Sequence, residues 1–153
     1  KALDYLNKAS NNEVIKKLPS YTSFIYLNKA LIYFHEDNFR QAQKNMSRLI
    51  LQEDFLFLDK GFQLKVLIAD VIIRFKNGHQ YIIDKIEDIR KNHKQLLLDE
   101  EYVRDREMIN IISKKINDED IADDKKTILS SMSDYDSEDL DIISYNFWLR
   151  NNL

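Results

Sequence analysis

The sequence has no cysteine, and it has only two glycines and one proline among 153 residues. The lack of cysteine excludes disulfide bonds, thiol nucleophiles and thiolate metal ligands within this chain. So few glycines and prolines leave too few turn-forming residues for a sheet of many strands, because tight hairpins use glycine at positive φ. An all-α fold, with helices joined by short turns, is therefore expected.

Long hydrophobic runs are also missing, since no segment approaches the roughly 20 apolar residues that a membrane-spanning helix needs. Hydrophobic residues make up 44% of the chain and charged residues 32%, which is typical of a globular protein with a core. The first residues lack the design of a secretory signal. Together with the absence of cysteine, these features predict a cytoplasmic protein.

Charge is distributed unevenly along the chain. Residues 1–50 carry eight Lys or Arg and four Asp or Glu, whereas residues 117–141 carry two and ten. Such an acidic stretch repels phosphate backbones, so it argues against a nucleic-acid partner. A nucleic-acid-binding module stays an alternative because of the basic first third, which contains Lys16, Lys17, Lys29, Arg40, Lys44 and Arg48.

One spacing of small and apolar residues recurs at intervals of 40 residues. The three sets are Ala2, Leu6 and Ala9; Ala42, Met46 and Leu49; and Ile82, Ile86 and Ile89. Steps of four and then three residues place all members of a set on one stripe of a helix. The sequence therefore predicts three equivalent helices, each the second helix of a hairpin.

The first helices of these hairpins are found by nearly the same offset. Ala30 lies within FIYLNKALIYF and Ala69 within LKVLIADVIIRF. A small residue at such a position lets two helix axes approach closely. Turns are predicted at residues 36–38 and 76–79, where Gly78 can take the left-handed conformation that ends a helix.

The unit at residues 23–56 resembles the tetratricopeptide (TPR) repeat, with its period of about 34 residues. The matching positions are Tyr26, Ala30, Tyr33, Phe39, Ala42, Met46 and Leu49. Lys29 departs from the family's preferred Leu, and Asp54 from its frequent Pro. HEAT-type repeats, with periods of about 40–47 residues, are the competing geometry. The resemblance implies antiparallel helical hairpins stacked as a short solenoid.

The C-terminal third is expected to continue the helices and to close the array. Residues 98–117 and 121–132 each carry an apolar stripe, and the last segment, SEDLDIISYNFWLRNNL, predicts a buried capping helix that starts at Asp136 or Ser137. We expect one domain over residues 1–153, with the clearest repeats in 1–95 and a degenerate repeat and cap in 96–153. The arrangement also resembles the C-terminal part of bacterial TPR-like proteins of unknown function, which implies a fragment of a longer chain.

A search for chemistry finds no catalytic arrangement. His35, His79 and His93 are widely separated, and the acidic segments 118–124 and 134–141 lack the Gly and Glu that a calcium loop needs at its sixth and twelfth positions. Carboxylates are abundant, but we expect none of them to lie on an apolar stripe, where burial would raise its pKa. The sequence therefore predicts no metal, no cofactor and no enzymatic activity.

By the TPR resemblance, the first helices of the hairpins line a concave groove that binds a partner peptide or domain. Leu27 and Leu31 stand where peptide-clamp members of the family use Lys and Asn, so that clamp is not expected here. A non-catalytic interaction scaffold is the expected function, and structural support for an upstream domain is a further alternative. The expected partner-binding residues are Leu27, Asn28, Leu31, His35, Asp70 and Arg74.

Overall fold

The computed structural model describes residues 1–17, 20–78, 81–130 and 141–153. Over these residues the chain is helical and has no strand, which confirms the all-α expectation. The α-helices are α1 (Ala2–Ser10), α2 (Tyr21–His35), α3 (Phe39–Ile50), α4 (Lys60–Lys76), α5 (Ile82–Asn92), α6 (Lys94–Leu98), α7 (Val103–Ile116), α8 (Ala122–Ser130) and α9 (Tyr145–Asn152). Short 3₁₀ turns lie at Ile15–Lys17, Glu53–Phe57 and Glu100–Tyr102.

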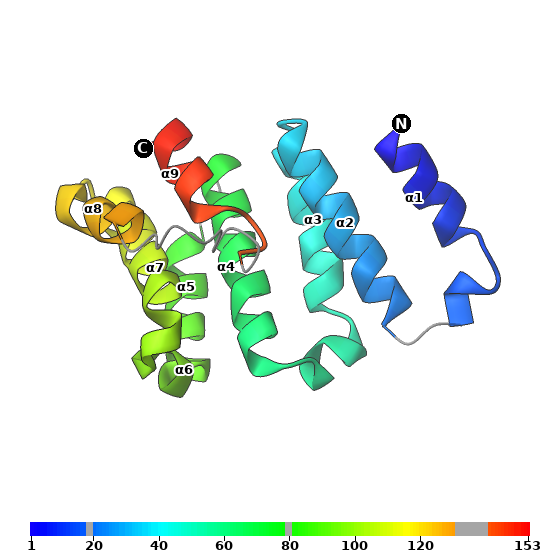
Figure 1. Cartoon of the computed structure of the whole chain (residues 1–153), viewed down its shortest axis with the longest axis horizontal. Helices are drawn as coiled ribbons and strands as arrows, with labels where there is room; N and C mark the ends of the chain where they lie inside the picture. Colours follow the sequence, from blue (N-terminus) through cyan, green and yellow to red (C-terminus); the bar gives the residue numbers. More distant parts are fainter. Residues whose placement is uncertain (18–19, 79–80, 131–140) are drawn as a thin grey trace.

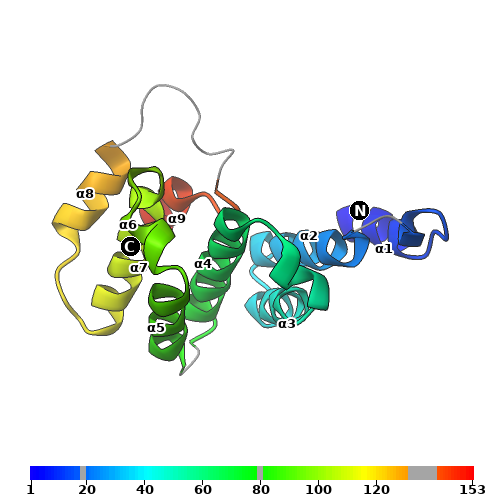
Figure 2. The ribbon, with the colours of Figure 1, turned by 90° about the horizontal axis from the view of Figure 1, so that it is seen from below.

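Consecutive helices lie side by side in a row that runs from α1 to α8 (Figure 1). Helices α2 and α3 form one antiparallel hairpin, and α4 and α5 form the next. Seen from below, α2 and α9 lie on one side of the row, whereas α3 and α5 lie on the other (Figure 2). The C-terminal helix therefore shares a face with α2.

The first hairpin forms where the sequence predicts it. Ala30 of α2 and Ala42 and Met46 of α3 have no exposed surface, as expected for small residues at a close crossing. The connecting turn contains Asp37 at a φ of 55°, and the Asn38 side chain caps α3 by accepting a hydrogen bond from the Gln41 amide at 3.3 Å. The predicted turn at residues 36–38 is confirmed.

Helix α4 is the centre of the molecule, because it packs against α3 on one side and against α5 and α7 on the other. It contributes the largest share of the core: Leu64, Val66, Ile68, Ala69, Val71, Ile72 and Ile73 are all buried. It ends at Lys76, and Gly78 follows at a φ of 67°, as predicted. His79, at the end of this predicted turn, lies outside the described residues.

The first helix is formed as predicted but is not part of the core. None of the residues of α1 is buried, and Leu6 and Ala9 of its stripe are only half-buried. Helix α1 packs against α2, and the Tyr21 hydroxyl donates a 2.8 Å hydrogen bond to the Ser10 carbonyl. The stripe that recurs in α3 and α5 is therefore buried only in those two helices.

The segment 98–117, whose apolar stripe was expected to continue the helices, is not helical throughout. Helix α6 ends at Leu98, the Asp99 side chain accepts a 3.1 Å hydrogen bond from the Glu101 amide, and α7 begins only at Val103. An acidic residue that caps a new turn interrupts the helix before the apolar stripe begins. That stripe, with Met108, Ile109 and Ile112, is buried as predicted.

The last helix is shorter than predicted. The predicted N-cap positions Asp136 and Ser137 lie outside the described residues, but residues 141–144 are described and are not helical. Ser144 caps α9 by accepting a hydrogen bond from the Phe147 amide at 3.3 Å. Tyr145, Trp148 and Leu149 are buried, as expected for a capping helix, whereas Phe147 is 61% exposed. A helix that lies on one face of α4 and α7 leaves its outer side in water.

Candidate binding groove along helix α2

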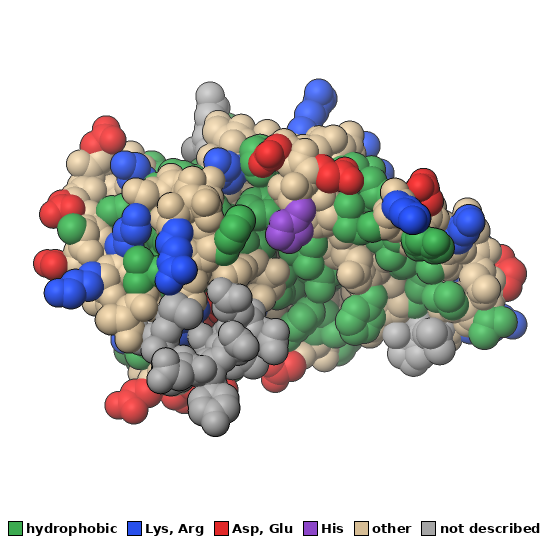
Figure 3. All heavy atoms as spheres, turned by 45° about the horizontal axis from the view of Figure 1, so that its top comes forward, with side chains coloured by type: hydrophobic (Ala, Val, Ile, Leu, Met, Phe, Trp, Pro, Cys, Tyr) green, Lys and Arg blue, Asp and Glu red, His purple; other side chains and the backbone are tan. Residues whose placement is uncertain are grey.

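An apolar stripe on α2 faces α4 and is only partly covered. Phe24 is 60% exposed, and Leu27 and Leu31 are half-buried. Two neighbouring hollows lie beside the stripe and share Leu27 and Phe62 as lining residues, and we treat them together as one candidate groove. We call it the α2 groove and define it by Phe24, Leu27, Leu31, Phe62, Lys65 and Ile142. Figure 3 shows hydrophobic side chains gathered over α2 on this face.

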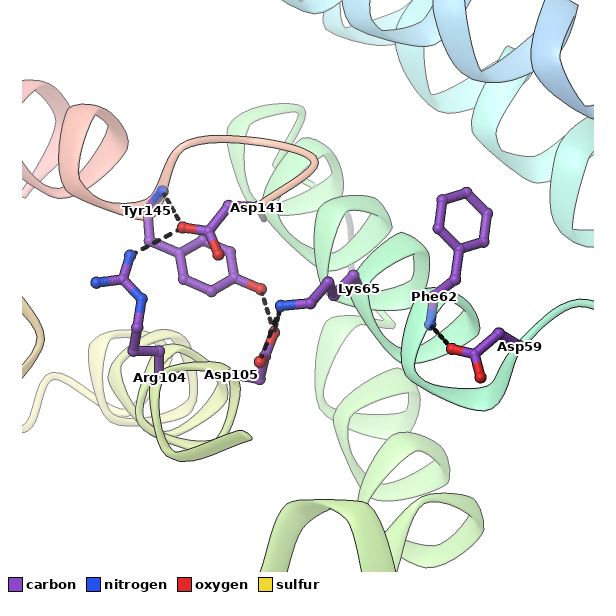
Figure 4. Close-up of polar contacts among 7 residues, drawn as sticks. All are labelled: Asp59, Phe62, Lys65, Arg104, Asp105, Asp141 and Tyr145. Carbon is purple, nitrogen blue, oxygen red and sulfur yellow. Dashed lines mark hydrogen bonds and ion pairs between the residues drawn. The ribbon is translucent and has the colours of Figure 1, made fainter. Parts of the chain in front are cut away.

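The opposite wall of the α2 groove is the N-terminal half of α4. Asp59 caps this helix by accepting a 3.0 Å hydrogen bond from the Phe62 amide (Figure 4). The hydroxyl of Tyr102 lies directly against Gly61, at a place that a Cβ atom would occupy. Glycine at position 61 therefore lets Tyr102 approach the backbone of α4. The larger of the two hollows has a volume of about 450 Å³.

A buried carboxylate lies behind this wall. Asp105 of α7 is 1% exposed and accepts hydrogen bonds from Lys65 of α4 at 3.2 Å and from the Tyr145 hydroxyl of α9 at 2.8 Å. Figure 4 shows both side chains pointing towards it. Burial and then the Asp105 charge raise the pKa of Tyr145 well above its usual value, so the hydroxyl stays a donor at neutral pH.

A second charged contact fixes the segment before α9. Arg104 donates a 2.9 Å hydrogen bond to Asp141, and the Tyr145 amide donates a longer one of 3.4 Å (Figure 4). Burial raises the pKa of Asp141, and the Arg104 guanidinium opposes that rise only in part. The Asp141 side chain is only 3% exposed, and its carboxylate accepts hydrogen bonds from Arg104 and from the Tyr145 amide in place of water.

The C-terminal segment covers the part of the inner face formed by α4 and α7. Trp148 packs edge-to-face on Phe75 of α4 with ring centroids 5.7 Å apart, and Lys76 donates a 2.6 Å hydrogen bond to the Asn152 side chain. Asp141 and Ile142 then line the α2 groove. The chain therefore occupies the α4–α7 side of this face itself, and the described residues leave the α2 side accessible.

The structure divides the six predicted partner-binding residues into two groups. Leu27 and Leu31 line the α2 groove, Asn28 is exposed beside it, and His35 is exposed at the C-terminal end of α2. Asp70 and Arg74 are buried and form an ion pair of 2.7 Å. Arg74 also reaches Ser47 of α3 at 3.2 Å. These two residues join α4 to α3 and do not face the groove, which corrects their expected placement.

The expectation that no carboxylate lies on an apolar stripe is also wrong. Asp105 precedes Met108 and Ile109 by three and four residues, so it lies on the buried stripe of α7. That spacing is visible in the sequence. Its partners Lys65 and Tyr145 are each 40 residues away, and no local pattern connects them.

Comparison of the chain with protein family models, with curated proteins and with solved structures found no match. Within the described ranges, no group of three or more His, Asp and Glu side chains is placed to hold a metal ion. None of the helices in those ranges is long and apolar enough to span a bilayer. The inference of function therefore rests on the geometry of the chain itself.

Proposed function

We propose that the chain is a TPR-like helical-repeat scaffold that binds a segment of a partner protein in the α2 groove and catalyses no reaction. Two consecutive hairpins, α2–α3 and α4–α5, support the repeat arrangement. In such arrays the first helices of successive hairpins line one inner face. Here those helices are α2 and α4, and the α2 groove lies between them.

One observation carries this proposal. Phe24, Leu27 and Leu31 are spaced by three and four residues and form a stripe on α2 that the described part of the chain leaves partly uncovered. The neighbouring stretch of the same face is covered by residues 141–153. Burial of apolar surface drives association, so a stripe left open beside a covered one is a suitable place for a partner.

The partner segment is an amphipathic helix. Helix α2 has 15 residues and is about 22 Å long at 1.5 Å per residue. A partner helix with apolar residues at steps of three and four can lay one side along this stripe. Asp59, exposed at the start of the wall formed by α4, offers an anion to polar groups at the edge of that helix.

The test is a selection of peptides of about 16 residues from a displayed random library, followed by fluorescence anisotropy with the 153-residue chain. The selected peptides should share apolar residues at helical spacing. Phe24→Glu should weaken their binding at least about tenfold, because it places a charge in the apolar contact. Phe24 is largely exposed, so the folded state should tolerate this change.

The matched control is Leu51→Glu. Leu51 is 81% exposed at the end of α3 and does not line the α2 groove. This variant should bind the selected peptides as the unaltered chain does. Equal weakening by both substitutions would show that the peptides recognise exposed apolar surface in general, and the proposal would then be abandoned.

A second candidate function, nucleic-acid binding, is favoured by one feature of the outer face. Arg40, Lys44 and Arg48 are all exposed on α3 and are spaced by four residues, so they form one basic stripe. Arg48 lies over the Tyr26 ring with its guanidinium carbon 5.9 Å from the centroid. A stripe of three cations is a modest electrostatic surface for a phosphate backbone.

A salt titration tests this second candidate. If the stripe binds single-stranded nucleic acid, affinity should be measurable at low ionic strength and should fall as salt rises, with Lys44→Gln reducing the slope by about one. No detectable binding at low ionic strength would exclude it, because phosphate contacts are strongest there. Helix α3 lies on the side of the row opposite the α2 groove, so the outcome of this titration does not bear on the scaffold proposal.

A further inference from the structure

A second hollow lies at the other end of α2 and shares no lining residue with the α2 groove. It has a volume of about 280 Å³ and is formed where α2 ends, α3 begins, α4 ends and α9 passes over them. We call it the α9 hollow. Its lining residues come from four helices and the α2–α3 turn, so its shape depends on the tertiary fold.

Aromatic rings form the walls of the α9 hollow. Phe34 of α2 and Phe39 of α3 pack edge-to-face with ring centroids 5.7 Å apart. Phe147 and Trp148 of α9 line the same hollow, and Phe147 is 61% exposed. Rings from three different helices thus surround a space of the size of a small flat molecule.

A cation lies among these rings. The Lys76 ammonium donates a 2.6 Å hydrogen bond to the Asn152 side chain and lies 5.4 Å from the centroid of the Phe39 ring. In the part of the chain that the structure describes, no carboxylate is within ion-pair distance of it. An ammonium has three N–H donors, so two remain for a ligand. His35, which is exposed at the same hollow, offers a further polar contact.

One acidic residue also lines the α9 hollow. Asp37 is exposed in the α2–α3 turn and forms no ion pair with a described residue. Its carboxylate weakens the attraction of Lys76 for an anion, but only modestly, because Asp37 is exposed and water screens its charge. The sign of its effect on binding therefore reveals the charge of the ligand.

We propose that the α9 hollow binds a small aromatic carboxylate, with its ring against the aromatic walls and its carboxylate on Lys76. The volume of about 280 Å³ lies just below the range of roughly 300–1,000 Å³ for drug-sized ligands, which fits a molecule with one ring. A charge-assisted hydrogen bond to an ammonium is stronger than a neutral one. This binding site is independent of the partner segment in the α2 groove, since the two share no residue.

The probe is benzoate, and the reporter is the fluorescence of Trp148, the one tryptophan of the 153-residue chain. Benzoate should change the emission in a saturable way, with a dissociation constant on the order of 1 mM for so small a ligand. Benzyl alcohol has a similar ring and no charge, and benzylamine carries the opposite charge. Both should bind at least about tenfold more weakly.

Variants at Lys76 and Asp37 test the two charges. Lys76→Gln should weaken benzoate binding about tenfold or more, Lys76→Arg should retain it, and Asp37→Asn should strengthen it by about two- to fivefold. The matched control is Lys44→Gln, an exposed lysine of α3 outside the hollow, which should bind benzoate as the unaltered chain does. The fluorescence of the Lys76→Arg variant also shows whether a change at this position disturbs α9.

Four results would overturn the proposal. The first is the absence of a saturable signal up to a benzoate concentration on the order of 20 mM, which is about 20-fold the expected dissociation constant. The second and third are equal binding of benzoate and benzyl alcohol, and tighter binding of benzylamine than of benzoate. The fourth is a Lys76→Gln variant that binds benzoate as tightly as the unaltered chain. Weaker benzoate binding by Asp37→Asn would also contradict an anionic ligand. None of these results depends on whether a peptide binds the α2 groove.

Discussion

The hydroxyl of Tyr145 donates a 2.8 Å hydrogen bond to the carboxylate of Asp105, and both residues are 1% exposed. The contact joins α9 to α7 across 40 residues of sequence. Lys65 of α4 binds the same carboxylate, so three helices meet at one buried charge. By holding α9 against α7, this contact helps to keep the C-terminal segment over the part of the inner face formed by α4 and α7.

Tyr145→Phe should lower the free energy of unfolding by about 1–3 kcal/mol. The change removes one donor from a buried, charged acceptor and leaves Asp105 with Lys65 as its remaining side-chain partner among the described residues. Urea denaturation followed by circular dichroism measures the difference. Tyr5→Phe is the control, because Tyr5 is 64% exposed and its substitution should change stability by less than about 0.5 kcal/mol. Equal midpoints for both variants would contradict this role of Tyr145.

Stability should fall as the pH drops below about 6.5, partly because of His93. Burial, and then the Lys60 charge, lower the pKa of His93 below its usual 6.5. The folded chain therefore favours neutral His93, whose contribution is fully present above about pH 6.5 and is lost as the pH falls through the folded-state pKa. The loss cannot exceed about 1.4 kcal/mol per pH unit for one proton.

His93→Gln should flatten the dependence of stability on pH in this range. Thermal or urea unfolding at several pH values measures the slope for each variant. His35→Gln is the control, because it removes a histidine whose side chain is exposed. A slope that stays the same in His93→Gln would assign the pH dependence to other groups.

Ala30→Trp should destabilise the α2–α3 hairpin by about 1–3 kcal/mol or more. Ala30 has no exposed surface, so an indole there overpacks the helix crossing. The melting temperature reports the effect. Asn28→Ala on the exposed side of the same helix is the control and should change it little. An unchanged melting temperature in Ala30→Trp would mean that α2 and α3 do not cross closely at this residue.

Asp37→Gly should stabilise the chain by about 0.5–1 kcal/mol. Asp37 has a φ of 55°, a left-handed conformation that costs less for glycine than for residues with a Cβ atom. Asp37→Ala should not stabilise, because alanine adopts this conformation less readily than aspartate. Melting temperatures of the two variants separate backbone strain from the loss of the charge, which both substitutions share.

Several features of the fold could be predicted because they depend on neighbours in sequence. The stripes Ala42–Met46–Leu49 and Ile82–Ile86–Ile89 are buried on α3 and α5, and Gly78 follows α4 with positive φ. Each of these depends on spacings of three or four residues or on the conformation of one residue. The start of α9 could not be predicted equally well, because several Ser and Asp residues before it can serve as a cap.

The candidate site could be predicted only in part. Leu27 and Leu31 were expected in a groove and line one, whereas Asp70 and Arg74 were expected there and are buried. All four lie on predicted helices, so the helix assignment does not separate them. The difference arises because α4 is packed on several sides, whereas α2 contacts α3 and α1 and keeps the stripe with Leu27 and Leu31 only partly covered.

The sequence by itself determined that this protein is helical, where most of its helices lie and which stripes they bury, because hydrophobic periodicity and turn chemistry act over a few residues. Only the tertiary structure decided that Asp105 lies between Lys65 and Tyr145, that residues 141–153 cover the inner face beside α4, and that α2 keeps an open groove. These relations join residues about 30 or more positions apart. Their physical reason is the packing of whole helices, which no local spacing specifies.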